Sequence, residues 1–391
     1  MKIHITKAQL YTLLSVKSET IFFERDKFSD NLFLVSQEVG FNQVITKVQT
    51  EGETPHNLEE ISLPYNQIKA LYSVIARGIT IEVMVDRTLK VYTDYIESSK
   101  NTSIALVALP NDSINEYRRD LIEPLSEPLV LSTEIFSHYL KVLQSPKYNS
   151  PYVEIVEITS DCFKYISAVE VIQHHTLNFN FPKDERVVFP FSTIATILKF
   201  IKGTETIAIT LSKIEDTRLL VISINDGTIL LNIELSNAMS EHPVPEESEL
   251  LFKLKNDVNT TTSMNHRLDL LSIPLSSNKT VPVQLSINPS APTVEQKVRV
   301  SAFDFNHQQS TVDIGDALED ISPNAKDIFV SHQHLTSSLP LIQLRDAQIS
   351  LAGGTTLKLE TISDVEDKTI IYIPTETPDT LEEEEDIEEE Y

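Results

Sequence analysis

Residues 187–202, VVFPFSTIATILKFIK, indicate how the chain is organised, because residues 61–77, ISLPYNQIKALYSVIAR, repeat the same pattern. In both segments a short apolar strand leads into a proline and an aromatic residue, and an amphipathic helix follows. Proline suits the first turn of a helix, since its missing N–H would have no partner there. Each segment is therefore predicted to be a strand followed directly by a helix.

The apolar side chains of each predicted helix fall on one face, at positions i, i+3, i+4 and i+7. A shift of 126 residues aligns Ile68, Leu71, Tyr72 and Ile75 with Ile194, Ile197, Leu198 and Ile201. The same shift aligns a second pair of amphipathic segments, Leu10, Leu13 and Leu14 with Phe136, Tyr139 and Leu140. One register thus covers two separate helices, which predicts tandem domains, each with two helices between strands.

A third and looser round follows the proline-containing acidic linker EHPVPEE at residues 241–247. IFVSHQHL at residues 328–335 stands where ISLPYNQI stood, and Pro340 predicts a kink in the helix that follows. A polar helix is predicted at residues 256–267. Strand patterns without long crossovers indicate antiparallel sheets. We predict an α+β chain with domains at residues 1–123, 124–243 and 244–378, and a disordered acidic tail at 379–391.

The composition excludes several classes of protein. The chain has 391 residues, 41% of them hydrophobic, which is enough for sizeable cores. Its eight glycines form neither of the common phosphate-binding loops, and its one cysteine, Cys162, excludes an internal disulfide. No apolar run approaches the roughly 18 residues of a membrane span. We expect a cytoplasmic protein that is not an enzyme and needs no cofactor or membrane.

The charges are divided unevenly along the chain, which has a net charge of −26. Six predicted helical windows hold twelve Lys or Arg and only two acids, Glu134 and Asp257; they are residues 6–17, 64–78, 132–147, 190–203, 253–267 and 331–345. If the helices line one surface, that surface is positive and the rest of the chain is negative. Lysines without regular aromatic stacking suit contact with duplex phosphates better than single-strand binding.

Other interpretations account for part of these patterns. Lys and Arg make good helix surfaces whatever lies opposite them, and a protein built of repeated β-rich domains can serve assembly rather than DNA. His174-His175 and His332-Gln-His334 lack a nearby carboxylate or cysteine set at familiar metal-ligand spacing. Asp316, Glu319 and Asp320 are better explained as a solvated loop than as a general acid and base.

Three tandem rounds with two helices each, an opening MKIHI strand and a proline-containing C-terminal strand resemble the bacterial-type DNA sliding clamp, the processivity subunit of replicative DNA polymerase. The resemblance covers residues 1 to about 375 and rests on segments such as ISLPYNQIKAL and VVFPFSTIATIL. It implies a homodimeric ring whose helices, packed inside curved sheets, face double-stranded DNA. It also implies DNA polymerase and clamp loader as partners. A clamp-like adaptor for transcription or repair is the alternative.

The basic residues of the helical windows give one set of candidate residues, and the resemblance gives the other. The DNA-facing set is Lys7, Lys69, Arg77, Lys141, Lys147, Lys199, Lys202, Lys255, Arg267 and Arg345. The partner-peptide pocket is Val153, Val169, Val171, Ile172, Tyr372, Ile373, Pro374 and Thr375.

Two features depart from the family. The segment AVEVIQ at residues 168–173 shares almost nothing with the family's TDGHRL, and an acidic tail with ten carboxylates follows Pro374. Such divergence suits a viral or otherwise specialised clamp, which would act in the host cytoplasm or nucleoid.

Overall fold

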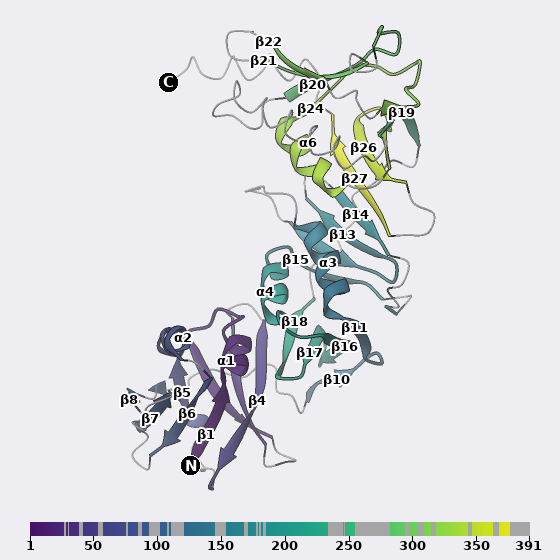
Figure 1. The fold of residues 1–391 in the computed structure, drawn as a ribbon. Coiled ribbons are helices and arrows are strands. Elements are labelled where there is room, and N and C mark those ends of the chain that lie inside the picture. Colours follow the sequence, from purple (N-terminus) through teal and green to yellow (C-terminus); the bar gives the residue numbers. More distant parts are fainter. Residues whose placement is uncertain are drawn as a thin grey trace, which may run out of the picture. The chain divides into compact units, whose positions relative to one another are not determined.

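The computed structural model is an α+β chain that divides into two compact units (Figure 1). Unit 1 is residues 1–138 and 187–235, and unit 2 is residues 139–186 and 236–391. The structure describes residues 1–26, 29, 31–38, 42–53, 58–75, 77–84, 88–93, 102–107, 109–110, 121–144, 154–167, 171–176, 179, 181–182, 185–233, 245, 247–254, 282–293, 297–303, 309–313, 318–342, 346–362 and 367–375. The predicted helix at 256–267 and the acidic tail lie outside these residues.

Unit 1 is built on an antiparallel sheet in which nine strands follow the order β10-β16-β17-β18-β4-β1-β6-β7-β8, while β2, β3, β5, β9 and β11 pair off this path. Its strands are β1 (Lys2–Thr6), β2 (Thr20–Arg25), β3 (Leu32–Gln37), β4 (Gln43–Glu51), β5 (Ile61–Pro64), β6 (Gly78–Val83), β7 (Thr88–Thr93), β8 (Thr102–Val107), β9 (Leu109–Pro110), β10 (Glu123–Pro124), β11 (Leu129–Ser132), β15 (Val187–Pro190), β16 (Thr206–Ile214), β17 (Thr217–Ile224) and β18 (Gly227–Asn232).

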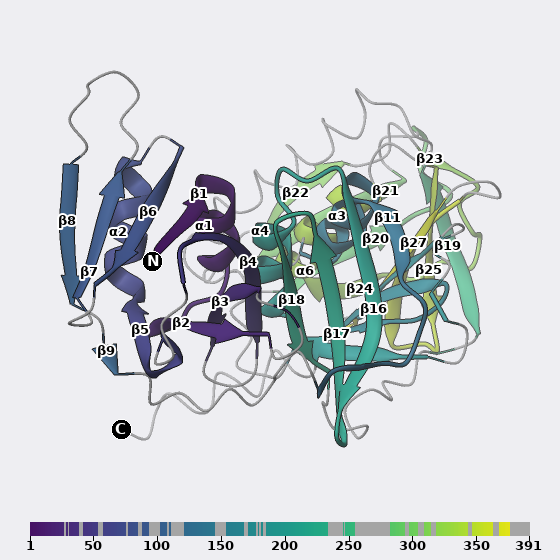
Figure 2. The same cartoon turned by 90° about the horizontal axis from the view of Figure 1, so that it is seen from below.

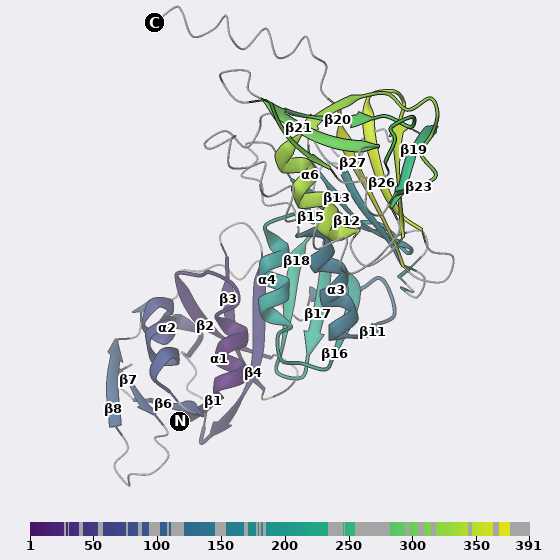
Figure 3. The same ribbon diagram turned by 45° about the horizontal axis from the view of Figure 1, so that its top comes forward.

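Three α-helices of unit 1 lie side by side on one face of this sheet (Figure 3). They are α1 (Lys7–Leu13), α2 (Tyr65–Val74) and α4 (Thr193–Phe200), and α1 contacts both of the others. A short 3-10 helix, η1 (Leu58–Glu60), precedes β5. The helix α3 (Thr133–Leu143) begins in unit 1 and ends in unit 2.

Unit 2 holds a second antiparallel sheet with the order β12-β13-β14-β27-β26-β25-β19-β23 and a smaller one with the order β22-β21-β20-β24. The helix α6 contacts β24 and β27 and continues into the 3-10 helix η6. The elements are β12 (Ile155–Ile158), β13 (Cys162–Ile166), β14 (Val171–His175), β19 (Ser248–Leu254), β20 (Pro282–Ile287), β21 (Val298–Phe303), β22 (Gln309–Asp313), β23 (Leu318–Glu319), β24 (Ile328–Ser331), β25 (Ala347–Ala352), β26 (Thr356–Thr361), β27 (Lys368–Pro374), α6 (His332–Ser338) and η6 (Leu339–Leu341).

The predicted repeat of strand and helix is present in the structure. The strands β5 and β15 have the same length and begin 126 residues apart, and each is followed by a helix. Of the eight apolar positions predicted for those helices, six are buried, whereas Tyr72 and Leu198 are half-buried. The six residues aligned in the other helix pair are all buried. The apolar periodicity therefore identified the core faces.

The predicted role of the prolines is wrong. Pro64 ends β5 and is the N-cap of α2, and Pro190 ends β15 three residues before α4 begins. Both prolines thus stop a strand instead of starting a helical turn, since a residue without an N–H cannot donate to a sheet. A kink is predicted at Pro340; in the structure α6 ends at Ser338 and Pro340 lies in the 3-10 helix η6 that continues it.

A buried carboxylate ties three strands of unit 2 together. Glu360 on β26 is 5% exposed, pairs with Lys358 at 2.6 Å and with Lys368 on β27, and accepts a hydrogen bond of 2.9 Å from Gln348 on β25. Burial alone would raise the pKa of this carboxyl, but the hydrogen bonds from both lysines and the glutamine outweigh it and lower the pKa to about 2.

We predict that Glu360→Gln lowers the stability of unit 2 by about 2 kcal/mol, because two ammonium groups lose their anionic partner. The depressed pKa means that the contribution of Glu360 is fully present above its unfolded-state pKa and is lost as the pH falls towards about 2. Urea unfolding of the full chain between pH 7 and pH 3 measures this. The exposed Glu249 provides the matched control Glu249→Gln, and equal stability of both variants at pH 7 would contradict the prediction.

Candidate nucleic-acid interface

The row of helices in unit 1 carries basic side chains and no acidic ones. The sequences of α1, α2 and α4 contain neither Asp nor Glu. Lys69 on α2, Arg77 just after it, and Lys202 just after α4 are exposed. A duplex phosphate meets no carboxylate on these three helices, so the row is suited to attract a polyanion.

Five further residues of the predicted DNA-facing set lie outside the row of helices or outside the described residues. Lys141 is exposed in the last turn of α3, where a cation interacts favourably with the helix dipole, and Glu134 occupies the first turn, where an anion does. Lys147, Lys255, Arg267 and Arg345 lie outside the described residues.

The N-terminus of α1 is fixed by a capping box. The Thr6 hydroxyl accepts a hydrogen bond of 3.1 Å from the backbone N–H of Gln9, and the Gln9 side chain accepts one of 2.9 Å from the backbone N–H of Thr6. The backbone N–H of Lys7 also donates to the carbonyl of Arg77 at 2.6 Å, which joins the start of α1 to the segment that follows α2. These bonds fix where α1, the middle helix of the row, begins.

Two of the predicted lysines are bound to protein atoms. Lys7 Nζ donates to the carbonyl of Ile75 at 2.8 Å and lies 5.4 Å from the centre of the Tyr72 ring. Lys199 Nζ donates to the carbonyl of Leu14, which also accepts a hydrogen bond of 3.3 Å from the Tyr65 hydroxyl. The pKa of Lys199 is lowered, first by partial burial and then by the positive charge of Lys69.

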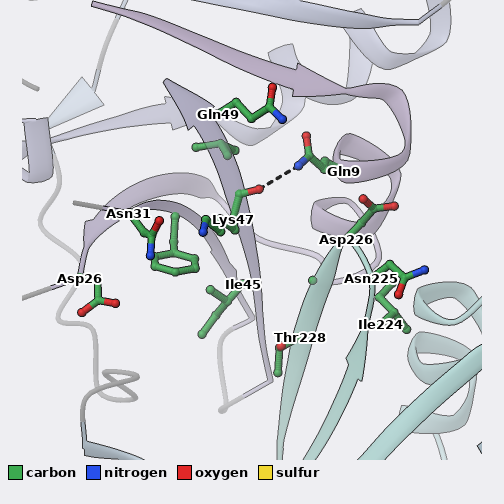
Figure 4. Close-up of a pocket in the computed structure, with 13 residues that line it drawn as sticks. Gln9, Asp26, Asn31, Ile45, Lys47, Gln49, Ile224, Asn225, Asp226 and Thr228 are labelled. Atoms are coloured by element: carbon green, nitrogen blue, oxygen red, sulfur yellow. Dashed lines mark hydrogen bonds between the residues drawn. The ribbon is translucent and has the colours of Figure 1, made fainter. Parts of the chain in front are cut away.

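A pocket of about 480 Å³ opens in unit 1 where β4 and β18 meet (Figure 4). The Gln9 side chain is held there by donating to the carbonyl of Lys47 at 2.8 Å. The lining mixes one lysine with two aspartates, so the pocket has no dominant charge; it consists of Gln9, Asp26, Asn31, Phe33, Ile45, Lys47, Val48, Gln49, Ile224, Asn225, Asp226, Gly227 and Thr228.

The predicted peptide-pocket residues that the structure describes are on neighbouring strands of unit 2. Val171 on β14 pairs with Tyr372 on β27, and Ile172 pairs with Ile371. Val171, Ile172, Tyr372 and Ile373 are all buried, whereas Pro374 is exposed and Thr375 is half-buried. Both faces of β27 are thus covered, and Pro374 with Thr375 form its accessible end. Val153 and Val169 lie outside the described residues.

Burial and hydrogen bonding determine the environments of three histidines and of Cys162. His332 is buried, and burial lowers the pKa of His334 to about 4, so its ring is neutral at pH 7. His174 lies within 3.0 Å of the Thr369 hydroxyl, and burial raises the pKa of Cys162 to about 12. Among the described residues, no group of three or more His, Cys, Asp or Glu is placed to hold a metal ion.

No helix in the described part of the chain is both long and apolar enough to cross a bilayer.

The fold is that of the DNA sliding clamps. No protein-family model matches the chain and no curated protein matches its sequence, but solved structures match over almost its whole length. Two of these structures are the DNA polymerase III β subunits from Pseudomonas aeruginosa and Caulobacter crescentus, with TM-scores of 0.71 and 0.72. Each is 11% identical to this chain, and each match covers 96% of this chain and 100% of the other. For the DNA polymerase sliding clamp from Bacillus subtilis the identity is 12% and the TM-score 0.69, with 96% of this chain and 99% of that one covered.

We predict that Lys69→Gln raises the pKa of Lys199, because the variant removes a like charge that disfavours the protonated amine. The Cε carbon shift of Lys199, followed by NMR as the pH is raised, reports this pKa. Lys202→Gln is the matched control, and we expect the pKa of Lys199 to change less in it. An unchanged Lys199 titration in Lys69→Gln would show that the two ammonium groups do not interact.

Proposed function

We propose that the chain is a sliding clamp that encircles double-stranded DNA and tethers a DNA polymerase to it. The observation that carries the proposal is the row α2-α1-α4, which has exposed cations and no acids on a chain with the clamp fold. Sequence-independent binding follows, because lysine and arginine would contact phosphates, which are the same at every base pair. The clamp's role is tethering, not catalysis.

The proposed assembly is a homodimeric ring of six clamp domains, with boundaries at residues 123, 243 and 378. Two edge strands support this assembly. Among the described residues, β8 pairs with β7 alone, as the edge position in Figure 2 illustrates, and β22 pairs with β21 alone. An unpaired edge is a template for another strand. A two-fold dimer would pair β8 of each chain with β22 of the other and leave neither edge open.

The proposed partners are DNA polymerase and a clamp loader, which would bind through short peptides. The proposed pocket combines Val153, Val169, Val171 and Ile172 with Tyr372, Ile373, Pro374 and Thr375. Because the described aliphatic residues and Tyr372 are buried, a peptide would meet the accessible end of β27 at Pro374 and Thr375 first. We place the protein in the cytoplasm, or in the host cytoplasm or nucleoid if it is viral.

We predict that the loaded protein stays on circular duplex DNA and leaves a linear duplex through its ends. Lys69→Glu with Lys202→Glu should weaken retention and polymerase stimulation, and removing two phosphate contacts should reduce the salt slope of log K by about 1.8. Lys326→Glu, at an exposed site of unit 2, is the matched control. Equal retention on both DNA forms would favour an adaptor or assembly protein, and a normal double variant would place the DNA path elsewhere.

We predict that ending the chain after Thr377 changes the affinity for partner peptides in a salt-dependent way and leaves thermal stability unchanged. The removed segment carries nine carboxylates, which would repel acidic peptides or attract basic ones. A chain of full length with these carboxylates changed to amides is the control, because it keeps the length and removes the charge. Identical peptide affinities in low salt would leave the tail without a part in partner binding.

A further inference from the structure

The C-terminal ends of α1 and α2 have no basic residue of their own. The last carbonyl groups of a helix lack partners within the helix and carry the negative end of its dipole. Neither the last turn of α1, capped by Leu14, nor that of α2, capped by Ile75, contains Lys, Arg or His. A cation that interacts with either helix end therefore has to come from another element.

Each end receives one from the neighbouring helix. Lys7, the first residue of α1, reaches the carbonyl of Ile75 at the end of α2. Lys199 on α4 reaches the carbonyl of Leu14 at the end of α1. The same kind of contact thus occurs twice along the row, from α1 to α2 and from α4 to α1.

Side chains of α2 reinforce both contacts. The Tyr72 ring lies below the Lys7 ammonium, where its face attracts a cation, and Tyr11 lies 6.1 Å from that ring. At the other end of α1, the hydroxyl of Tyr65 occupies the second lone pair of the Leu14 carbonyl. Each ammonium group is therefore oriented towards a carbonyl at the end of the neighbouring helix.

We propose that Lys7 and Lys199 are positioning residues that cap the neighbouring helix, and that they act on DNA through the arrangement of Lys69, Arg77 and Lys202 instead of touching phosphate. The DNA part of this inference rests on the proposed function, whereas the capping part does not. The row then contains two kinds of lysine. Lys7 and Lys199 donate to carbonyls of the neighbouring helix, whereas Lys69 and Lys202 present their charge from exposed positions.

Amide hydrogen exchange of the full chain without DNA tests the capping. In Lys199→Met, which keeps an unbranched side chain but removes the ammonium group, we expect the amides of Leu13, Leu14 and Ser15 to exchange about five to ten times faster. In Lys7→Met the same should happen at Val74 and Ile75. Lys202→Met is the matched control and should leave both helix ends unchanged. Unchanged exchange at the two ends in the capping variants would overturn the proposal.

Arginine variants keep the test decisive if a methionine variant unfolds. Lys7→Arg and Lys199→Arg retain the charge and the donor, so exchange should stay within about twofold of the unsubstituted chain. Protected helix ends in folded methionine variants, or frayed ends in the arginine variants, would each contradict capping.

Retention on circular duplex then separates the capping from the DNA-binding role. A phosphate contact predicts that Lys199→Met lowers the salt slope by about 0.9 even when the helix ends stay protected. Positioning predicts that retention falls only together with faster exchange. If no form of the protein is retained on circular DNA, the proposed function fails while the exchange result still decides the capping.

Discussion

The strand β4 determines how unit 1 is arranged, because it pairs with three other strands. Its first residues pair with β18, as in Ile45 with Thr228, and its last residues pair with β1, as in Thr50 with Ile3. The strand β3 pairs along its other side. One long strand thus joins the first repeat to the second, and this junction brings α4 beside α1. Gly227 permits the approach, since a Cβ there would lie 2.8 Å from the carbonyl of Ile45.

The position of α1 between α2 and α4 explains why acids are absent from the row. The ends of α1 and α2 are already capped by lysines from their neighbours, and Lys69 lies close enough to Lys199 to lower its pKa. A carboxylate on this surface would pair with those lysines and compete for the contacts that hold the helices. The charge pattern therefore suits the packing of the helices as well as the proposed anionic ligand.

The sequence predicted the elements in which apolar residues recur with one clear period. It failed for a strand without alternation and for contacts between residues far apart in the chain. The helix faces followed from the spacing of residues such as Ile68 and Ile194, which are fully buried. The strand β2 was missed, because TIFFER is buried at four successive positions and so shows no alternation. The exposed cations were predicted from charge alone. The capping by Lys7 and Lys199 could not be predicted, because each lysine lies more than sixty residues from its acceptor.

The carboxylate of Glu360 also makes three strands of unit 2 depend on one another. Its partners come from β25, β26 and β27, so the charge can leave water at low cost only when all three strands are present. Without β27 the carboxylate would keep Gln348 and Lys358 but lose Lys368. The pairing of β27 with β26 therefore carries an electrostatic contribution in addition to its backbone hydrogen bonds.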